Sequence, residues 1–565
     1  MIKILYHSNF SEANTGFGKA AKNFLLALYN DPNYEIIEAA NHLPEYSDGK
    51  KPWKCRGTLS QDINIINQIR GDHNKERANS YGYYVIDKII EEERPDIYIG
   101  VEDVWAFYEY SNKPWWNIIH KIIWTTLDSI PILPFALDIA PKCDKFLVWA
   151  SFAKKELNKN GIHNVEVLHG PVDISNFYPF DSDKKLEIRK RHGIGDDFII
   201  GFVFKNQLRK SVTNLIDGFV KFKELKPELK PKLLLHTDWA DIAQGWDIPR
   251  YMREKSVEND DVLAGYVCNR CGNYFVRSYV GEEKDCNICH CQKSVNTKTS
   301  DLGVSEEQLN EIYNLMDVYC HPFTSGGQEI PIQEAKAAGL ITLVTEYSCG
   351  TDSCYPDQGG IPLDWKEYRE PQTQFVKATT LPESICEKLV EVATMPSKRR
   401  EQFCINAKNY VEEEFSVSAV IDKFKELIKD FDKVEYPESE APVVSSGKFS
   451  DFFDKSDENK RIAVVMPESA GDLLFINSLL DNLKSLYPDD NLYVITKNQF
   501  FDMVEDHPAV YKLIPYSDGL DNLLYLEGQN NHNGYFRCAF LPFVGSQRVL
   551  NYMHNGSDKC QFELY

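Results

Sequence analysis

Short apolar runs alternate with amphipathic stretches along most of the chain. The first run covers residues 2–6, and a polar turn containing Gly16 and Gly18 follows it. Phe24 and Leu28 then begin a face with helical spacing. A strand, a glycine-rich turn and a helix form the opening unit of a doubly wound α/β domain, so the pattern predicts a parallel sheet covered by helices.

This unit recurs over residues 1–178, where we predict the first Rossmann-like domain. Further buried strands are expected at residues 97–100, 120–124, 145–149 and 165–168. Glu102, Asp103 and Asp128 come shortly after the first two of these strands. Because ligands of open parallel sheets bind where the strands end, the three carboxylates are candidates for acceptor binding, although such residues are also common caps and turns.

A second domain of the same plan is predicted over residues 179–435. Its strands are expected at residues 198–204, 232–236, 318–320 and 340–344, and an amphipathic helix is expected at 415–431. Residues 436–450 are rich in Pro and Ser and poor in apolar residues, which is typical of a linker. The alternation then restarts and predicts a small accessory α/β domain over residues 451–565.

The richest segment for chemistry covers residues 321–339, which combine a strand end, a glycine-rich loop and a short helix. The backbone N–H groups of Gly326, Gly327 and the helix start are expected to point at a diphosphate. Glu334, one turn into the helix, has a carboxylate that can accept hydrogen bonds from both hydroxyls of a ribose. By itself the segment is equally consistent with an ordinary loop and a helix cap.

A basic turn follows the predicted strand at 198–204 and contains Lys205, Arg209 and Lys210. Cations placed over a leaving diphosphate stabilise the charge that develops in the transition state. A solvated basic turn is the alternative interpretation of this segment alone.

Taken together, these segments resemble glycosyltransferase family 4, whose members are retaining enzymes with the GT-B fold. Glu334 matches the second of two glutamates in the family's donor motif, and Lys210 resembles the lysine that grips the donor diphosphate. The loop around Gly16 resembles the glycine loop that faces the donor across the cleft. Residues 170–179 resemble the interdomain signature, so the resemblance extends over roughly residues 1–432.

The resemblance implies two Rossmann-like domains with a nucleotide-sugar donor held between them. It implies that Lys205, Arg209 and Lys210 hold the diphosphate and that Glu334 holds the ribose. Lys210, Glu334, Asp128 and Glu102 are accordingly the residues predicted to act in catalysis and acceptor positioning. No catalytic metal is expected, because the leaving phosphate assists the acceptor in this family.

One residue departs from the family pattern. Gly326 stands where the first glutamate of the donor motif is expected, and that glutamate usually contacts the donor sugar. Glu329 lies three residues further along the same loop and is a candidate to replace it.

Five of the 14 cysteines fall between residues 268 and 291. Cys268 and Cys271 form one C-x2-C pair, and Cys286 and Cys289 form another. Four thiolates at this spacing close a tetrahedral site, so the sequence predicts a structural zinc ribbon over residues 266–299. The ribbon is basic, so it is a candidate for contact with an acceptor, a protein partner or nucleic acid. The alternative is a loop that the metal stabilises and that has no partner.

The third region resembles the first half of the heptosyltransferases of family 9, on residues 471–474 and the apolar positions that follow. The half that would bind a donor has no counterpart here. This resemblance implies an accessory module for a protein partner or a second copy of the chain.

Composition narrows the function classes further. The formal net charge is −22, which disfavours broad binding to nucleic acid or anionic membranes. No apolar run approaches the roughly 18 residues that a membrane span needs, and the first residues turn polar too soon for a signal peptide. Scattered single cysteines suit a reducing compartment, so we expect a cytoplasmic protein.

The sequence thus predicts a glycosyltransferase that uses a nucleotide-sugar donor and an unidentified acceptor. Two alternatives stay open. Gly326, and a third region that resembles only half of a family 9 enzyme, favour a catalytically degenerate scaffold with a binding role. Lys210 and Glu334 argue against this alternative. The basic ribbon favours a transferase acting on modified nucleic acid, against which the net charge argues.

Overall fold

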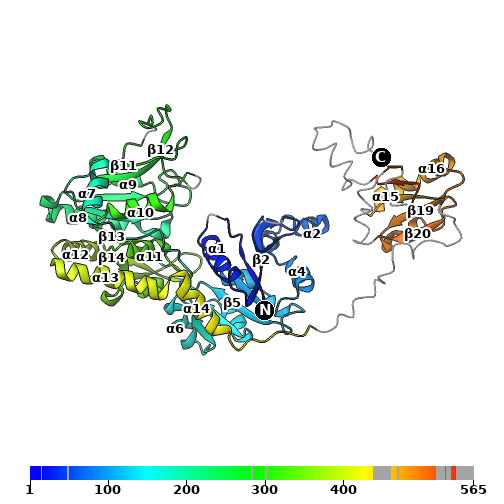
Figure 1. Cartoon of the computed structure of the whole chain (residues 1–565), viewed down its shortest axis with the longest axis horizontal. Helices are drawn as coiled ribbons and strands as arrows, with labels where there is room; N and C mark the ends of the chain where they lie inside the picture. Colours follow the sequence, from blue (N-terminus) through cyan, green and yellow to red (C-terminus); the bar gives the residue numbers. More distant parts are fainter. Residues whose placement is uncertain are drawn as a thin grey trace. The chain divides into compact units, whose positions relative to one another are not determined.

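The computed structural model describes residues 1–436 apart from 14, 48–49, 282–283 and 300–301, and then 460–467, 470–516, 528–529 and 536–542. The chain divides into two compact units, Met1–Tyr436 and Pro437–Tyr565. Mainly parallel sheets flanked by helices build both units, as the alternating pattern predicts (Figure 1).

The first sheet has seven parallel strands in the order β3-β2-β1-β4-β5-β6-β7. Its strands are β1 (Ile2–Asn9), β2 (Tyr34–Pro44), β3 (Lys54–Leu59), β4 (Ile97–Val101), β5 (His120–Thr125), β6 (Lys145–Val148) and β7 (Val165–Val167). Its helices are α1 (Gly16–Tyr29), α2 (Ile63–Ile69), α3 (His73–Ser80), α4 (Ile86–Glu93), α5 (Pro134–Ile139) and α6 (Ser151–Lys159). The strand order reverses between β1 and β4, so the loops after these strands border the usual ligand position.

The turn between β1 and α1 requires glycine. Thr15 caps α1, and its Oγ1 accepts a hydrogen bond from the Gly18 N–H at 3.0 Å. A Cβ atom at Gly18 would lie 2.4 Å from the carbonyl oxygen of Ala13, so no larger residue fits there.

The second sheet repeats this plan in the order β11-β10-β9-β8-β13-β14-β15, and β12 pairs with β10. Its strands are β8 (Ile199–Val203), β9 (Lys232–His236), β10 (Val262–Cys268), β11 (Tyr274–Ser278), β12 (Val295–Thr297), β13 (Val318–His321), β14 (Thr342–Thr345) and β15 (Gly360–Leu363). Its helices are α7 (Ser182–Arg191), α8 (Val212–Leu225), α9 (Ile248–Glu254), α10 (Glu306–Asn314), α11 (Ile330–Ala337), α12 (Pro382–Ala393) and α13 (Ser397–Glu414). Only β11 and β12 run antiparallel, and the order reverses between β8 and β13.

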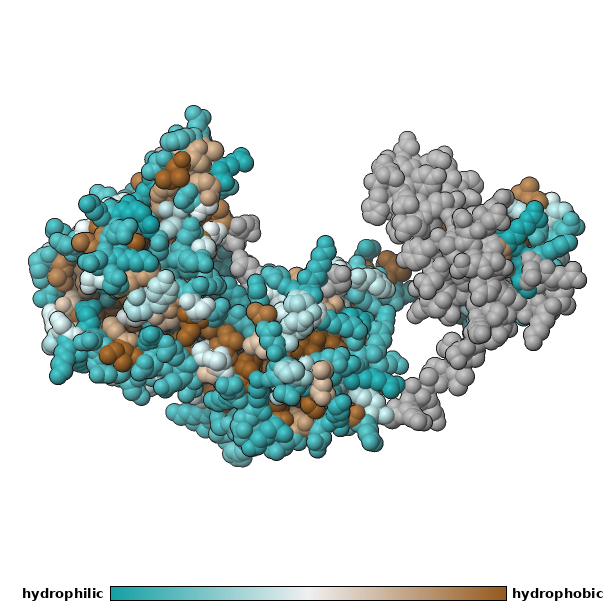
Figure 2. Space-filling model, in the orientation of Figure 1, coloured by the Kyte–Doolittle hydropathy of each residue, from teal (hydrophilic) through white to brown (hydrophobic). Residues whose placement is uncertain are grey.

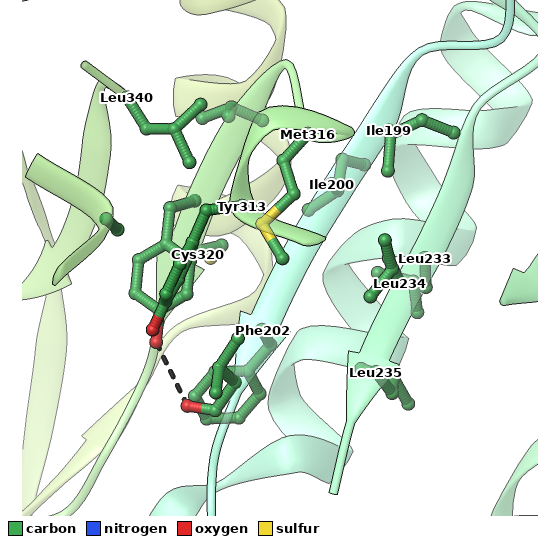
Figure 3. Close-up of a cluster of buried hydrophobic side chains, with 14 of the residues drawn as sticks. Ile199, Ile200, Phe202, Leu233, Leu234, Leu235, Tyr313, Met316, Cys320 and Leu340 are labelled. Carbon is green, nitrogen blue, oxygen red and sulfur yellow. Dashed lines mark hydrogen bonds between the residues drawn. The ribbon is translucent and has the colours of Figure 1, made fainter. Parts of the chain in front are cut away.

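Side chains of neighbouring strands pack into one core in this sheet. Figure 3 shows Leu233, Leu234 and Leu235 of β9 beside Ile199, Ile200 and Phe202 of β8. Met316 packs on β8 so closely that a Cβ atom at Gly201 would lie 1.9 Å from its sulfur. A hairpin of β16 (Trp365–Arg369) and β17 (Val376–Thr380) follows the sheet.

The last helix of the first unit, α14 (Val417–Ile428), packs against the first sheet although it follows the second in sequence. Phe424 contacts Phe24 of α1 with ring centroids 4.9 Å apart, and Lys425 pairs with Asp31 at 2.6 Å. The sequence-based boundary put this helix in the second domain, because periodicity shows that a helix is amphipathic and not which sheet it covers.

The second unit contains a small sheet in the order β20-β19-β18-β22-β21. Its strands are β18 (Arg461–Val465), β19 (Asn491–Thr496), β20 (Lys512–Pro515), β21 (Gly528–Gln529) and β22 (Cys538–Phe540), and its helices are α15 (Ala470–Asn477) and α16 (Leu480–Leu486). Strands β18 and β19 lie in the region where the sequence predicts that the alternation of apolar and polar residues restarts. The linker residues from 437 to 450 lie outside the described residues.

Among the described residues, every helix is too short or too polar to span a bilayer. The residues coloured by hydropathy in Figure 2 are mostly hydrophilic on this face, in keeping with 26% charged residues.

Candidate functional site

The predicted donor loops meet at the carboxyl ends of β8 and β13, where the strand order reverses. The loop after β8 contains Lys205 and ends in a 3-10 turn, η4 (Leu208–Lys210). The loop after β13 runs from residue 322 to Glu329, which precedes the first turn of α11. A doubly wound sheet holds its ligand at this position.

Glu329 joins the two loops. Its carboxylate pairs with Arg209 Nη1 at 2.6 Å and with Lys210 Nζ, and His321 Nε2 lies 3.3 Å away. Glu329 and Lys210 are almost fully buried, whereas the Arg209 side chain is 42% exposed. Two of the three predicted diphosphate cations therefore share one buried carboxylate, and Lys205 stays exposed.

Burial and charge act in opposite directions on these groups. Burial lowers the pKa of Lys210 to about 8, against the attraction of Glu329. Burial by itself would raise the pKa of Glu329, but the charges of Lys210 and Arg209 hold it well below its usual value. Lys210 and Glu329 are consequently both charged at neutral pH. Burial lowers the pKa of His321 to about 4, so its ring is neutral there.

Glu329 also fills the space that a side chain at position 326 would need. A Cβ atom at Gly326 would lie 2.6 Å from Glu329 Oε1 and 3.4 Å from the Cys349 sulfur. The glycine and the relocated glutamate thus form a compatible pair, because a glutamate at position 326 would clash with the one at 329.

Glu334 lies inside α11 with 6% of its surface exposed. The Tyr313 hydroxyl donates a hydrogen bond to its Oε2 at 2.7 Å. Burial raises the pKa of Glu334, while the charge of Lys19, in α1, opposes that rise. Gly16, at the start of α1, lies opposite α11, since a Cβ atom there would be 4.0 Å from Ile330 Cδ1.

Asp128 is the predicted acceptor carboxylate of the first domain that lies beside the predicted donor loop, residues 322–329. Ser325 Oγ donates to its Oδ2 at 3.1 Å, and Ser129 Oγ donates to its Oδ1 at 2.8 Å. Lys377 Nζ donates to the hydroxyls of Ser129 at 2.6 Å and Ser325 at 2.7 Å. The two domains therefore meet in a polar cluster next to Gly326.

Glu102 and Asp103 lie deeper in the N-terminal domain. Glu102 is 2% exposed and accepts a hydrogen bond from Asn41 Nδ2 at 3.3 Å, and burial raises its pKa to about 8. Asp103 accepts from Thr126 Oγ1 at 2.8 Å, and burial raises its pKa as well. Of the three predicted acceptor carboxylates, the structure brings only Asp128 into hydrogen-bond contact with the donor loop.

Two further contacts close the donor loop against the first domain. The side-chain amide of Gln328 exchanges hydrogen bonds with the backbone of Gly170, at 2.8 Å from the Gly170 N–H and 2.9 Å to its carbonyl. Gly327 packs against Thr126, whose Cβ would be 2.4 Å from a Cβ atom at position 327. The second glycine thus serves domain packing.

The four predicted metal ligands are together. The sulfur atoms of Cys268, Cys271, Cys286 and Cys289 lie within 4.8 Å of one another. The separations are 3.6 Å for Cys268–Cys289 and 3.8 Å for Cys271–Cys286. A Zn–S bond of about 2.3 Å gives a tetrahedral S···S edge of about 3.8 Å, so the donor set fits a thiolate-bound zinc ion.

Several residues around the candidate donor site were not predicted from the sequence. They are His321, Gln328, Tyr313, Lys377, Ser325 and Lys19. Gln328 and Ser325 lie within the loop already singled out, but an amide or hydroxyl gives no signal until its partner is known.

Comparison with known proteins finds similarity of fold but no match by family model or to a curated protein. No protein-family model and no curated protein matches the chain. Among solved structures, sucrose-phosphate synthase from Thermosynechococcus elongatus is similar with a TM-score of 0.54 at 12% identity, over 76% of this chain and 98% of that one. A glycosyltransferase from Rickettsia africae is similar with a TM-score of 0.52 at 13% identity, over 76% and 99% of the two chains.

The HepE protein of Anabaena, solved with UDP and glucose, gives a TM-score of 0.51 at 11% identity, over 76% of this chain and all of that one. The chain has the GT-B fold. At this level of identity the GT-B likeness concerns the arrangement of the two domains, and the choice of ligand depends on the side chains of this chain.

Proposed function

We propose that this GT-B protein is a glycosyltransferase that takes a sugar from a nucleotide-diphosphate donor. The observation that carries the proposal is the pair of cations, Lys210 and Arg209, at the sheet edge where the strand order reverses and beside the N-terminus of α11. A diphosphate at this edge would replace the carboxylate as the partner of both cations and meet the N–H groups of the helix start.

The remaining predicted residues fit around such a donor. Glu334 would accept hydrogen bonds from the ribose, and Gly16 would let the α1 loop approach from the other domain. Lys205 is exposed and can reach a phosphate. Transfer with retention and without a catalytic metal stays part of the proposal, as the family resemblance implies.

Glu329 takes the part of the missing first glutamate in this proposal. It is charged, it lies in the volume next to Gly326, and it is bonded to the cations that the diphosphate would claim. Once the diphosphate has taken those cations, the carboxylate is free to turn toward hydroxyls of the donor sugar. Asp128, held by Ser325, is placed to orient an acceptor beside it.

A degenerate binding scaffold is the second candidate, and one observation favours it. The carboxylate of Glu329 already pairs with both predicted diphosphate cations and offsets one of their two charges, which is an arrangement expected if no anionic ligand ever enters. The two candidates differ in whether a nucleotide displaces Glu329.

A thermal-shift screen with UDP, GDP, ADP and their common sugar conjugates separates these candidates. A ligand that binds only the folded state raises the melting temperature by mass action. We expect one nucleotide to stabilise the wild type and Tyr313→Phe, which loses only the hydroxyl next to Glu334, but not Glu334→Ala. If no nucleotide stabilises the metal-loaded protein at millimolar concentration, the glycosyltransferase proposal is rejected in favour of the binding scaffold.

A further inference from the structure

The cysteine ribbon is rooted at the ligand edge of the donor sheet. The first half of β10, Val262–Ala264, pairs with β9, and its second half, Tyr266–Cys268, pairs with β12. Strand β12 therefore continues the line of β9 beyond its carboxyl end, as the ribbon strands rise from the sheet in Figure 1. The ribbon returns to the body of the domain at this edge.

Lys298 is the first residue after β12, and it lies at the junction. Its backbone N–H donates to the carbonyl of Gly265 at 3.3 Å, next to the position where β9 ends. Gly265 is itself in tight contact with His236, since a Cβ atom there would lie 2.4 Å from His236 Nδ1. The Lys298 side chain is partly buried at the strand ends.

Three lysines, Lys298, Lys205 and Lys19, carry positive charge near this edge. Lys205 follows β8 and Lys298 lies beside the end of β9, and these two strands pair through Val203 and His236. Burial lowers the pKa of Lys298, Asp238 opposes the shift, and the charges of Lys19 and Lys205 add to it. Lys19 lies in the first turn of helix α1 in the other domain, and its charge also opposes the rise in the pKa of Glu334. In the part of the chain that the structure describes, none of the three lysines forms an ion pair.

This positive cluster stands out in a protein of net charge −22. Lys298 is partly buried, whereas Lys19 and Lys205 are exposed. Like charges that lie close together repel, and an anion between them reduces the repulsion. The cluster lies beside Glu334 and the loop after β8, which are the parts assigned above to the nucleotide. A nucleoside diphosphate is therefore the anion that fits the cluster.

The start of β12, three residues before Lys298, contacts the segment that contains the four cysteines. Strand β12 has three residues, and Ser294 precedes it. The Cys268 thiol donates to Ser294 Oγ at 3.4 Å, and the Asn269 N–H donates to the Ser294 carbonyl at 2.8 Å. So short a strand has little stability of its own. A metal ion would hold the four sulfurs together and with them the start of β12.

We infer that Lys298 is a donor-binding residue supplied by the ribbon, and that metal bound to the four cysteines strengthens nucleotide binding without touching the nucleotide. The inference rests on the proposed donor site. It assigns the ribbon a part in the cleft, in addition to stabilising its own loop.

A thermodynamic cycle tests the inference by calorimetric titration. The ligand is whichever of UDP, GDP and ADP the screen above selects, and the proteins are the wild type and Lys298→Met, each metal-loaded and chelator-stripped. We expect stripping and Lys298→Met each to weaken binding about tenfold, as for the loss of a hydrogen bond to a charged group. Stripping should add little to Lys298→Met, because the metal acts through that lysine.

Two control variants separate position from charge. Lys298→Arg keeps the cation and should bind within about threefold of the wild type, on the scale of a changed but retained contact. Lys293→Asn removes an exposed ribbon charge at a positive φ of 45°, which Asn tolerates, and should leave the dissociation constant unchanged.

Reciprocity gives a second readout that needs no variant. If metal strengthens nucleotide binding by a given factor, the nucleotide must strengthen metal binding by the same factor, measurable by competition with a chromogenic chelator. Equal nucleotide affinity in loaded wild type and loaded Lys298→Met, or in loaded and stripped wild type, overturns the inference. If loaded wild type binds no nucleotide at all, the proposed function fails and takes the inference with it.

Discussion

Replacing Glu329 with glutamine keeps the shape of the side chain and removes the charge that Lys210 and Arg209 share. Glu329 is 3% exposed and the Lys210 side chain 6%, so water cannot replace the lost partner. Removing one member of a buried ion pair costs about 3–5 kcal/mol. Lys210 can escape by releasing its proton, which at pH 7 costs about 4.6 kcal/mol relative to the usual lysine pKa, so both routes give a similar loss of unfolding free energy.

The same substitution should improve binding of the bare nucleotide. A diphosphate no longer competes with a resident carboxylate for Lys210 and Arg209, so the nucleoside diphosphate should bind Glu329→Gln more tightly than the wild type. A nucleotide sugar should lose the additional affinity that comes from its sugar, because Glu329 is the proposed sugar contact. The melting temperature without ligand should fall by roughly 5 °C or more, as expected for a loss of this size in a chain of several hundred residues.

The assay is a pair of titrations, with the nucleoside diphosphate and with its sugar conjugate, together with thermal unfolding of each protein. Glu383→Gln is the control, because Glu383 is 69% exposed and pairs with Lys221 at 3.2 Å on the surface. Breaking that pair should change stability by less than about 1 kcal/mol. Equal nucleotide affinity and equal stability in wild type and Glu329→Gln would refute the displacement of Glu329 by the donor.

Three further changes test other parts of the structure. Glu102→Gln removes a carboxyl whose pKa burial raises from 4.5 to about 8, so the folded state holds its proton more tightly than the unfolded chain, and wild-type stability falls as pH rises through this range. The variant should gain on the wild type by up to about 4–5 kcal/mol above pH 8, and a difference in melting temperature that does not change between pH 4 and 9 contradicts this. Gly327→Ala brings a Cβ atom to 2.4 Å from that of Thr126 and should cost about 1–3 kcal/mol of unfolding free energy. The same change made on Thr126→Gly should cost almost nothing, and an undiminished cost would show that the close approach is not its cause. Cys271→Ser should abolish binding of one zinc ion per chain, as measured by elemental analysis, whereas Cys291→Ser, outside the group of four, should retain it; equal zinc content in the two variants would rule out the tetrathiolate site.

Features that depend on neighbours in sequence could be predicted from the sequence alone. The strand and helix periods gave the two sheets and the restart after residue 450, because alternation of apolar and polar residues encodes which backbone form can bury a face. The C-x2-C spacing brought Cys268, Cys271, Cys286 and Cys289 into one group, since each pair is local and a short loop joins them. The candidate donor loop and the basic turn were predicted from residue type and from the family resemblance.

Only the tertiary structure decided which side chains meet. The sequence could not place Glu329 between Arg209 and Lys210, about 120 residues away, or show that it fills the space at Gly326. Lys298 looked like one more basic residue of the ribbon until the pairing of β12 with β10 brought it to the strand ends. Helix α14 needed the structure for the same reason. A local pattern determines the backbone form and the buried face of a segment, whereas its contact partners depend on how distant segments pack together.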